Sequence, residues 1–305
     1  MSFANFVVAA LLVNGVAAKS ETLCGQYDRY TSSLSPFTFA ANQWGDDGSG
    51  SQCIKVGVRP PFPDPNVDLI KIANDDTVFN ATWKWSDNAD SVHSFPNIKL
   101  NSVLLPLQLS NLSSLNISAS WSMTAASQSK TVEEVDTTAN VIIDMFLDPS
   151  PVSANSTTLP KYEIMIWLAE FGGKRPIGFS SSIKNPPHYS LNSTNFTLYS
   201  GPNTNGQFVY SWLGYTNITD FDEDISPLLH YLWRHKLIDD TNYLGIVQFG
   251  TETFHATSNV VFSAYDYNLS IAAGTPYEEK SASTMIMPDL ALSLFSAVVF
   301  LVVFI

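Results

Sequence analysis

The sequence predicts an all-β fold, a sandwich or barrel, from its composition and from the spacing of its turn residues. Only 14% of the 305 residues are charged and 12% are aromatic, whereas Ser, Thr and Asn are abundant and long helical repeats are scarce. Between residues 37 and 270, short apolar runs alternate with Gly, Pro, Asn and Ser, which is typical of strands separated by turns. A chain of this length forms one large β domain or two average domains.

Residues 162–167 have the two-residue alternation of a strand. Ile164 and Ile166 fall on one face, which we predict to meet the core, and Glu163, Met165 and Trp167 fall on the opposite, exposed face. An indole ring can stack on a sugar, and a carboxylate can carry out the chemistry beside it. We therefore interpret this face as the floor of a sugar-binding cleft. The alternative is an ordinary strand with a solvated glutamate, because the role of a strand residue depends on what the rest of the fold packs against it.

Two further acids lie within predicted strands. Asp144 is in the middle of an apolar run at residues 140–146, and Glu252 shares a face with Gln248 in a strand predicted over residues 243–254. A buried acid needs a partner or a raised pKa. We therefore expect Asp144 and Glu163 to pair.

One α-helix is predicted, beginning where Ser226 and Pro227 have the pattern of a cap followed by a first-turn proline. Its apolar stripe consists of Ile225, Leu228, Leu229, Leu232 and Trp233. His230 and His235 fall on or beside the polar side. We interpret them as solvated residues or as cations near the helix C-terminus, and not as catalysts.

The chain has a net charge of −13, which argues against nucleic acid or anionic lipid as a partner and suits a neutral substrate. We expect no metal site, because two cysteines and five scattered histidines have no ligand spacing. We expect the protein to be a monomer.

Both ends of the chain have the pattern of targeting segments. Residues 1–18 resemble a signal peptide, with a buried first strand as the alternative. We expect a β domain over residues 19–272, a polar linker over 273–289 and an apolar tail over 290–305. Small residues near Ser281, followed by that tail, are typical of a glycosylphosphatidylinositol (GPI) attachment signal, so we predict Ser281 as the attachment residue. A retained transmembrane tail and a buried strand are the alternatives.

An oxidising, extracellular location follows from these segments. Cys24 and Cys53 are the two cysteines of the chain, and in a secreted protein we expect them to form a disulfide. Eight Asn-x-Ser/Thr sequons support a secreted glycoprotein, displayed by its lipid anchor on the outer face of the plasma membrane or in the cell wall. The predicted glycosylation sites are Asn80, Asn111, Asn116, Asn155, Asn192, Asn195, Asn217 and Asn268.

A series of short motifs, in order along residues 23–270, resembles glycoside hydrolase family 12, the small jelly-roll endoglucanases and xyloglucan hydrolases. The motifs are Cys24-Gly25-Gln26-Tyr27, Asn42-Gln43-Trp44-Gly45, Gly50-Ser51-Gln52-Cys53, Trp83-x-Trp85, Ser94-Phe95-Pro96-Asn97, the strand with Asp144, the strand with Glu163, Gly172-Gly173, Pro176-Ile177-Gly178 and Phe249-Gly250-Thr251-Glu252-Thr253-Phe254. The resemblance implies a β-jelly-roll sandwich of two antiparallel sheets, with a concave substrate cleft and one α-helix.

The resemblance also implies roles for individual residues. Glu163 would be the nucleophile, Glu252 the general acid/base, and Asp144 the neighbour that controls the protonation of Glu163. The residues implied to bind the glucan are Asn42, Trp44, Met165, Trp167, Pro176, Gly178 and, with an aromatic ring of a different type from most members, Tyr27.

The function predicted from these features is a retaining endo-β-1,4-glucan hydrolase that acts on cellulose-like glucan, xyloglucan or mixed-linkage glucan without a cofactor. One alternative is a cell-surface transglycosylase, in which a sugar acceptor replaces water at the same intermediate. Another is a wall-binding surface glycoprotein without activity, which would be expected to lack one of the carboxylates.

Overall fold

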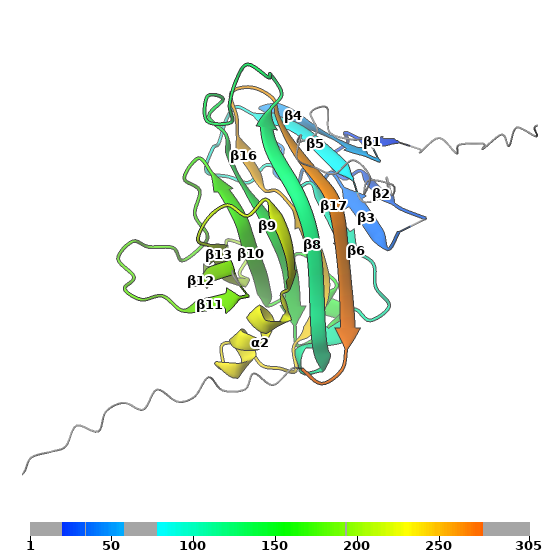
Figure 1. The fold of residues 1–305 in the computed structure, drawn as a ribbon. Helices are drawn as coiled ribbons and strands as arrows, with labels where there is room; N and C mark the ends of the chain where they lie inside the picture. The colour runs from blue at the N-terminus through cyan, green and yellow to red at the C-terminus, as the bar shows by residue number, and fades with distance from the viewer. Residues whose placement is uncertain (1–19, 34, 58–77, 193, 277–305) are drawn as a thin grey trace, which may run out of the picture.

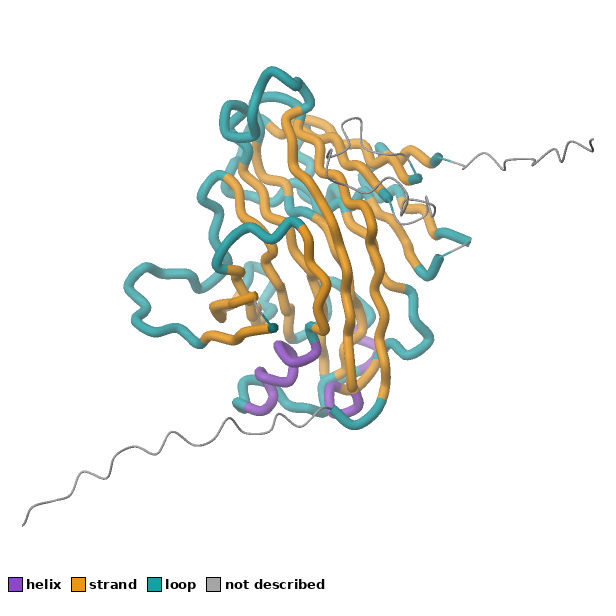
Figure 2. The backbone as a smooth tube through the Cα atoms, in the orientation of Figure 1, coloured by secondary structure: helices purple, strands orange, loops and turns teal. Residues whose placement is uncertain are grey.

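The computed structural model describes residues 20–33, 35–57, 78–192 and 194–276. These residues form two β-sheets that pack face to face, with the helices gathered at one end of the sandwich (Figures 1 and 2). The predicted all-β sandwich is confirmed.

The smaller sheet has six strands in the order β1-β4-β5-β17-β8-β14. These strands are β1 (Glu21–Leu23), β4 (Gly50–Val56), β5 (Phe79–Trp85), β8 (Leu112–Ala125), β14 (Asp220–Asp224) and β17 (Val260–Ala273). The long strands β8 and β17 pair along most of their length and form the centre of this sheet (Figure 1).

The larger sheet has eleven strands, nine of them in the order β11-β12-β13-β10-β9-β15-β6-β3-β2. These nine are β2 (Arg29–Thr31), β3 (Phe37–Ala40), β6 (Asn97–Leu100), β9 (Thr138–Asp148), β10 (Tyr162–Phe171), β11 (His188–Leu191), β12 (Thr194–Pro202), β13 (Phe208–Gly214) and β15 (Tyr243–Gly250). The other two are β7 (Leu107–Gln108), which pairs with β15, and β16 (Thr253–His255), which pairs with β9.

The expectation of two purely antiparallel sheets is wrong at one place. Strands β10 and β13 pair in parallel, whereas every other pairing between the described strands is antiparallel. A parallel pair needs a long return connection. The chain supplies one, because the loop after β10 and the hairpin of β11 and β12 intervene before β13.

Aromatic rings from both sheets form the centre of the core. Phe39 of the larger sheet packs edge to face on Phe79 of the smaller sheet with ring centroids 5.8 Å apart, and Phe79 packs on Phe262 at 5.7 Å. Phe249 stacks on Tyr267 across the sandwich at 5.4 Å. These contacts hold the larger sheet against a continuous apolar layer.

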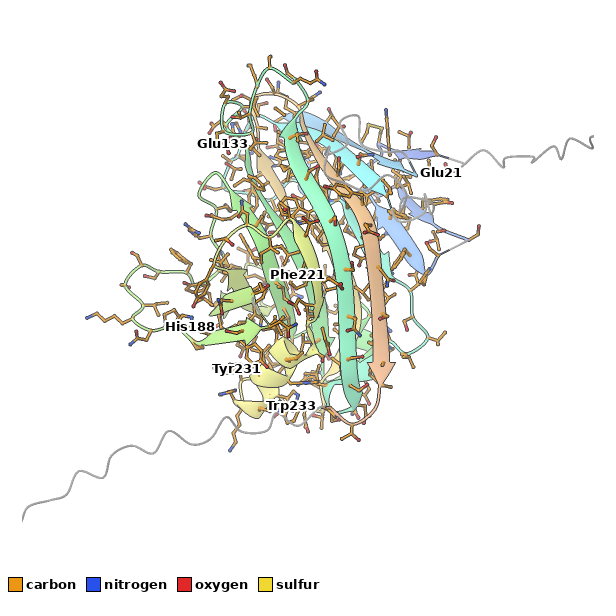
Figure 3. All side chains as sticks on the ribbon, viewed as in Figure 1. Glu21, Glu133, His188, Phe221, Tyr231 and Trp233 are labelled. Carbon is orange, nitrogen blue, oxygen red and sulfur yellow. A yellow bond between two sulfur atoms is a disulfide. The ribbon has the colours of Figure 1, made fainter. Side chains whose placement is uncertain are left out.

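The main helix is α2 (Ser226–Arg234), and a shorter α1 (Pro151–Ala154) and a 3-10 turn at Leu109–Asn111 accompany it. The predicted apolar stripe of α2 is confirmed, with Ile225, Leu228, Leu229 and Leu232 fully buried. Figure 3 labels Tyr231 and Trp233 on α2 beside the sandwich.

Two details of α2 differ from the prediction. Ile225, and not Ser226, is the N-cap, and the Ser226 backbone N–H donates to the Asp224 carboxylate at 2.9 Å. His230 is buried, with Nε2 2.9 Å from the Leu112 carbonyl oxygen, because the helix lies against the start of β8. His235 is exposed at the helix C-terminus as expected, 2.8 Å from the Tyr231 carbonyl oxygen.

Cys24 and Cys53 form the predicted disulfide, which links the segment after β1 to strand β4. The buried amide of Gln43 lies next to it and donates to the Cys24 carbonyl oxygen at 3.0 Å. The bond therefore fixes the N-terminal segment beside the loop that carries Asn42 and Trp44.

The predicted glycosylation sites fall into two groups. Asn80 is only 4% exposed within β5, so a glycan on this nitrogen would require the groups that cover it to move, and its glycosylation stays a prediction. The other seven predicted sites are exposed: Asn111, Asn116, Asn155, Asn192, Asn195, Asn217 and Asn268.

The predicted signal peptide at 1–18, Ser281 and the apolar tail at 290–305 lie outside the described residues. Over the described ranges, no helix has the length and apolar character needed to cross a membrane. The domain boundaries at 19–272 and 273–289 stay predictions.

We expect the disulfide to contribute about 3–4 kcal/mol to the free energy of unfolding, because it closes a loop with a sequence separation of 29 residues in the unfolded chain. The double variant Cys24→Ala/Cys53→Ala should therefore unfold at a lower urea concentration than the wild type. The wild type, denatured without reductant, should expose no thiol to a labelling reagent. Equal midpoints for the two proteins, or a labelled thiol in the wild type, would contradict this.

Candidate active site

Strand β10 has the predicted alternation of side chains. Ile164 and Ile166 are fully buried in the core between the sheets, and Glu163, Met165 and Trp167 lie on the opposite face. That face is not exposed as expected, since the three residues are only 9%, 8% and 3% accessible. Side chains from the neighbouring strands pack around Met165 and Trp167, so Glu163 lies on a largely dry floor beside this apolar cluster.

Strand register brings Asp144 next to Glu163. Met165 on β10 is opposite Asp144 on β9, and Asp144 is opposite Gln248 on β15. Side chains directly opposite on neighbouring strands share a face. Asp144 and Gln248 therefore lie on the same face as Glu163, and Asp144 is its diagonal neighbour. The register places the two acids close together, but among the described residues no hydrogen bond joins Asp144 to Glu163, and Asp144 Oδ1 has no hydrogen-bond partner, so their pairing stays a prediction.

Glu252 lies between two strands and not within one. The single strand predicted over residues 243–254 is wrong, because β15 ends at Gly250 and β16 begins at Thr253. The connection is held by Asn140 of β9. The Asn140 side chain accepts from the Glu252 backbone N–H at 2.9 Å and donates to a Glu252 carboxylate oxygen, and its backbone N–H donates to the Glu252 carbonyl at 3.1 Å.

A second asparagine holds Glu163. Asn203, in the turn between β12 and β13, donates from Nδ2 to Glu163 Oε2 at 3.0 Å and to Gln207 Oε1 at 3.0 Å. Its own Oδ1 accepts from the Gln207 backbone N–H at 2.9 Å, so the amide is fixed at both ends. We did not single out Asn140 or Asn203 from the sequence. Their only signals are an asparagine at the start of an apolar strand and a turn rich in Asn and Gly.

Burial is the main cause of the raised pKa values of the two glutamates. It raises the pKa of Glu163 to about 7, with a further contribution from the charge of Glu252 and an opposing one from the Asn203 hydrogen bond. It also raises the pKa of Glu252 to about 7, opposed by the Asn140 hydrogen bond and by the charge of Lys174. Two interacting carboxyls with similar pKa values share one proton near neutral pH.

The pKa of the third acid, Asp144, is raised as well. Its side chain is buried, and this burial, together with the charges of Glu163 and Glu252, raises its pKa well above the usual value of 3.8. Asp144 therefore stays protonated where an exposed aspartate would be ionised. The three acids together can therefore hold one ionised carboxylate beside protonated carboxyls. Nucleophilic substitution with acid assistance needs both forms, one to attack and one to donate a proton.

The aromatic side chains predicted to bind the glucan on one side of the acids are exposed, so a ligand can contact them. Tyr27 and Trp44 are 63% and 54% exposed, and the buried Gln43 joins their loops by donating its backbone N–H to the Gln26 carbonyl at 2.9 Å. The Asn42 carbonyl accepts from the Phe95 backbone N–H at 2.9 Å, which places this loop beside the chain segment that adjoins Glu252.

On the other side, the loop after β10 contains Pro176, which is buried, and brings Gly178 against β12. Gly178 has a φ of +82°, and a Cβ on it would approach the Ser200 carbonyl oxygen to 2.0 Å, so this close contact requires glycine. Phe179 follows, with its ring centroid 5.1 Å from that of Tyr199. Tyr199 is opposite Ser211, which is opposite Met165, so its ring lies on the face of the acids. Sequence reasoning missed Phe179 and Tyr199.

Comparisons with known proteins point in one direction. The family model described as Glycosyl hydrolase family 12 matches residues 35–272. The xyloglucan-specific endo-β-1,4-glucanase A of Emericella nidulans is 31% identical, over 87% of this chain and 97% of the relative. The enzyme of the same name from Aspergillus aculeatus is also 31% identical, over 81% of this chain and 90% of the relative.

Solved structures agree. Endoglucanase 3 of Trichoderma harzianum has a TM-score of 0.65 and 27% identity, over 83% of this chain and 98% of that one. The catalytic domain of Humicola grisea Cel12A, solved with a thio cellotetraose, has the same TM-score and identity, over 82% of this chain and 99% of that one. The match over most of the described domain shows that this chain belongs to glycosyl hydrolase family 12.

Proposed function

We propose that this glycoside hydrolase is a retaining endo-β-1,4-glucanase that cleaves internal bonds of a cell-wall glucan by double displacement. The observation that carries the proposal is the pair of acids, Glu163 and Glu252, each with a pKa of about 7 and each held by a separate asparagine. A fold that lost its chemistry would have little reason to keep such a pair, because burying acids costs stability.

In the first displacement, the ionised carboxylate of Glu163 attacks the anomeric carbon. Glu252 donates its proton to the glycosidic oxygen as the bond to the leaving sugar breaks, and a glycosyl ester of Glu163 forms. In the second displacement, Glu252 takes a proton from water, the water oxygen attacks the anomeric carbon, and Glu163 leaves as a carboxylate. Two inversions give back the β configuration. We assign Asp144 the role of a protonated neighbour that controls the charge of Glu163.

The glucan would lie across the larger sheet. On the non-reducing side we assign Asn42, Trp44 and Tyr27 to its binding, and on the leaving-group side Pro176 and Gly178. The apolar floor of Met165 and Trp167 would lie beneath the sugar that is attacked. Support for a β-1,4-glucan comes from the names of the relatives, which are xyloglucan-specific endo-β-1,4-glucanases, and from the thio cellotetraose bound to the Humicola enzyme.

We also propose that the enzyme is extracellular and lipid-anchored near Ser281. The disulfide and the seven exposed sequons support passage through an oxidising secretory route. The anchor rests on the sequence pattern of residues 281–305 alone. The monomeric state and the alternative of transglycosylation stay predictions from the sequence.

The retaining mechanism predicts the stereochemistry of the first product. Proton NMR of a fresh hydrolysate should show the β-hemiacetal before the α form appears by mutarotation. Glu163→Gln should lower kcat by about 10⁴-fold or more, because the amide cannot attack the anomeric carbon. The two carboxyls should be about 5–5.5 Å apart in a substrate complex.

Variants of Glu252 provide the matched control for that experiment. Glu252→Ala should lose less activity on a substrate with an activated leaving group than on a glucan, and azide should partly restore its turnover by attacking the intermediate without a general base. Azide should not restore Glu163→Gln. An α-product formed first would contradict the proposed mechanism.

The Asn203 hydrogen bond and the Lys174 charge act on opposite limbs of the pH–rate profile. Activity needs Glu163 ionised and Glu252 protonated. Asn203→Ala removes the hydrogen bond that lowers the pKa of Glu163, so the acid limb of kcat/KM should move to higher pH. Lys174→Met removes the charge that lowers the pKa of Glu252, so the alkaline limb should move to higher pH.

The controls are Asn205→Ala in the same turn and Lys55→Met on the exposed surface of β4. Neither should move either limb. Movement of the acid limb to lower pH in Asn203→Ala, or equal movement of both limbs in both variants, would show that the assignment of the two acids is wrong.

The raised pKa of Asp144 predicts a pH-dependent gain in stability for Asp144→Asn. Below the usual aspartate pKa of 3.8, the carboxyl is protonated in the folded and unfolded chains alike. At higher pH the unfolded chain ionises while folded Asp144 keeps its proton, so wild-type stability falls. The Tm of Asp144→Asn relative to wild type should therefore rise between about pH 4 and pH 7. Asp222→Asn, at an exposed position of β14, should show no such trend.

A further inference from the structure

A hollow of about 460 Å³ opens where the chain between β6 and β7 leaves strand β15. Strand β9 pairs with one side of β15 along most of its length. On the other side, β7 pairs with Tyr243 and Leu244, and β6 pairs with residues 248–250. Gly245 and Ile246 fall between these two pairings and line the hollow. The hollow is therefore a gap in the larger sheet, and its volume is within the range of about 300–1,000 Å³ that ligand pockets in proteins have.

Polar and apolar side chains both line the hollow, and none of the lining residues is acidic. Leu105 and Ile246 can contact the C–H face of a sugar ring, and the half-buried Lys99 ammonium can donate to a hydroxyl or carbonyl oxygen. The Asn101 amide is oriented by donating to Thr38 Oγ1 at 2.9 Å. A few oriented polar groups among apolar ones are the usual composition of a site for a small neutral molecule.

The sequence places a glycosylation signal at the rim of the hollow. Asn155, with Ser156 and Thr157, forms a sequon, and of the eight sequon asparagines it alone lines the hollow. Its side chain is exposed at the end of α1. An N-linked glycan begins with an N-acetylglucosamine joined to the asparagine Nδ2, so a glycan here begins beside the hollow. Such a tether raises the effective concentration of the sugar to roughly the millimolar range, so contacts too weak to bind a free sugar from dilute solution can fill the site.

The backbone on both sides of Asn155 is held against the sheet. Before it, the Ala154 carbonyl lies so close to β15 that a Cβ on Gly245 would be 2.1 Å from its oxygen, so this contact requires glycine. After it, the Thr157 carbonyl accepts from Gln207 Nε2 at 3.4 Å. The attachment point is therefore fixed at the rim, and a sugar joined to it loses little freedom on entering the hollow.

Four large apolar side chains are exposed on the two segments that border the hollow. Val103, which lines it, and Leu104 precede β7, and Val152 and Leu159 lie on either side of Asn155 in the sequence. Clustered apolar exposure, unlike single exposed residues, indicates a surface that another group covers. A glycan that starts at Asn155 is placed to cover apolar side chains of both segments.

We propose that the hollow binds the first N-acetylglucosamine residues of a glycan on Asn155, so that this glycan is a packed part of the folded domain. The proposal goes beyond the proposed function and uses no residue assigned to the glucan or to the chemistry. It draws only on the proposed passage through the secretory route. The tether selects this occupant, because the glycan is always beside the hollow whereas a free sugar must reach it from solution.

The test measures how fast an endoglycosidase cuts between the first and second sugars of each glycan on the native, full-length secreted chain. The expression host adds high-mannose glycans, and glycopeptide mass spectrometry follows each site separately. The glycan on Asn155 should be cut about tenfold or more slowly than those on Asn116 and Asn268, because the enzyme reaches only the small fraction that has left the hollow. Asn116 and Asn268 are exposed on the smaller sheet. In the denatured chain the three rates should be equal.

Filling the hollow should remove this protection. Asn101 is exposed directly after β6 and lines the hollow, so Asn101→Phe places a ring in it. In this variant the glycan on Asn155 should be cut within about twofold of the rate at Asn268. Ser51→Phe, at an exposed position of β4 in the other sheet, is the matched control and should keep the protection.

Loss of the glycan should also lower stability. Thr157→Val removes the sequon and leaves Asn155 in place, and it should lower the Tm by about 2–4 °C, the shift that one modest contact gives in a domain of this size. Asn155→Gln should have the same effect. Asn268→Gln, which removes a glycan from an exposed strand position, should not.

Equal cutting rates at Asn155 and Asn268 in the native wild type, or an unmodified Asn155 in the secreted protein, would overturn the proposal. Protection that Asn101→Phe leaves intact would overturn it too, because something other than the hollow would then shield the glycan. Release of reducing sugar from a β-glucan, measured on the same samples, tests the proposed function separately. Protection without hydrolysis supports the hollow and counts against the glucanase, and hydrolysis without protection does the reverse.

Discussion

The site depends on partly removing two interacting carboxyls from water. Burial raises the pKa of Glu163 and of Glu252 to about 7, and the hydrogen bonds from Asn203 and Asn140 oppose it. Without these amides, buried Glu163 and partly buried Glu252 would each lose a hydrogen-bond partner, which is costly. The two asparagines come from different places, one from a turn and one from the first residues of a strand. The acids are therefore oriented by the sandwich as a whole and not by their own strand.

The dry floor follows from a sheet that has apolar side chains on both faces. Ile164 and Ile166 on one face of β10 pack against the opposite sheet, and Met165 and Trp167 on the other form a second apolar cluster. An antiparallel sheet with a solvated outer face would leave Glu163 in water with an ordinary pKa. The second cluster is what turns an alternating strand into a place where a carboxyl titrates near neutral pH.

How much could be predicted from the sequence depended on the range of the interactions. The two faces of β10 and the stripe of α2 follow from local periodicity, and both were predicted. The disulfide had one possible pairing. The burial of His230 could not be predicted, because the start of β8, which is distant in sequence, covers it. The hydrogen bond from Asn203 to Glu163 joins residues 40 positions apart in the sequence, and the one from Asn140 to Glu252 joins residues 112 positions apart.

The same pair interaction also accounts for how Glu252 can serve first as an acid and then as a base under the proposed mechanism. While Glu163 is ionised, its negative charge makes loss of the Glu252 proton unfavourable, so Glu252 keeps the proton that the leaving sugar needs. Once Glu163 becomes a neutral ester, that repulsion ends, whereas the Lys174 charge and the Asn140 hydrogen bond remain. Both of these favour the carboxylate, so the pKa of Glu252 falls and the group is ready to take a proton from water. The protonation state of one acid is thus set by the covalent state of the other, and no movement of the backbone is needed between the two displacements.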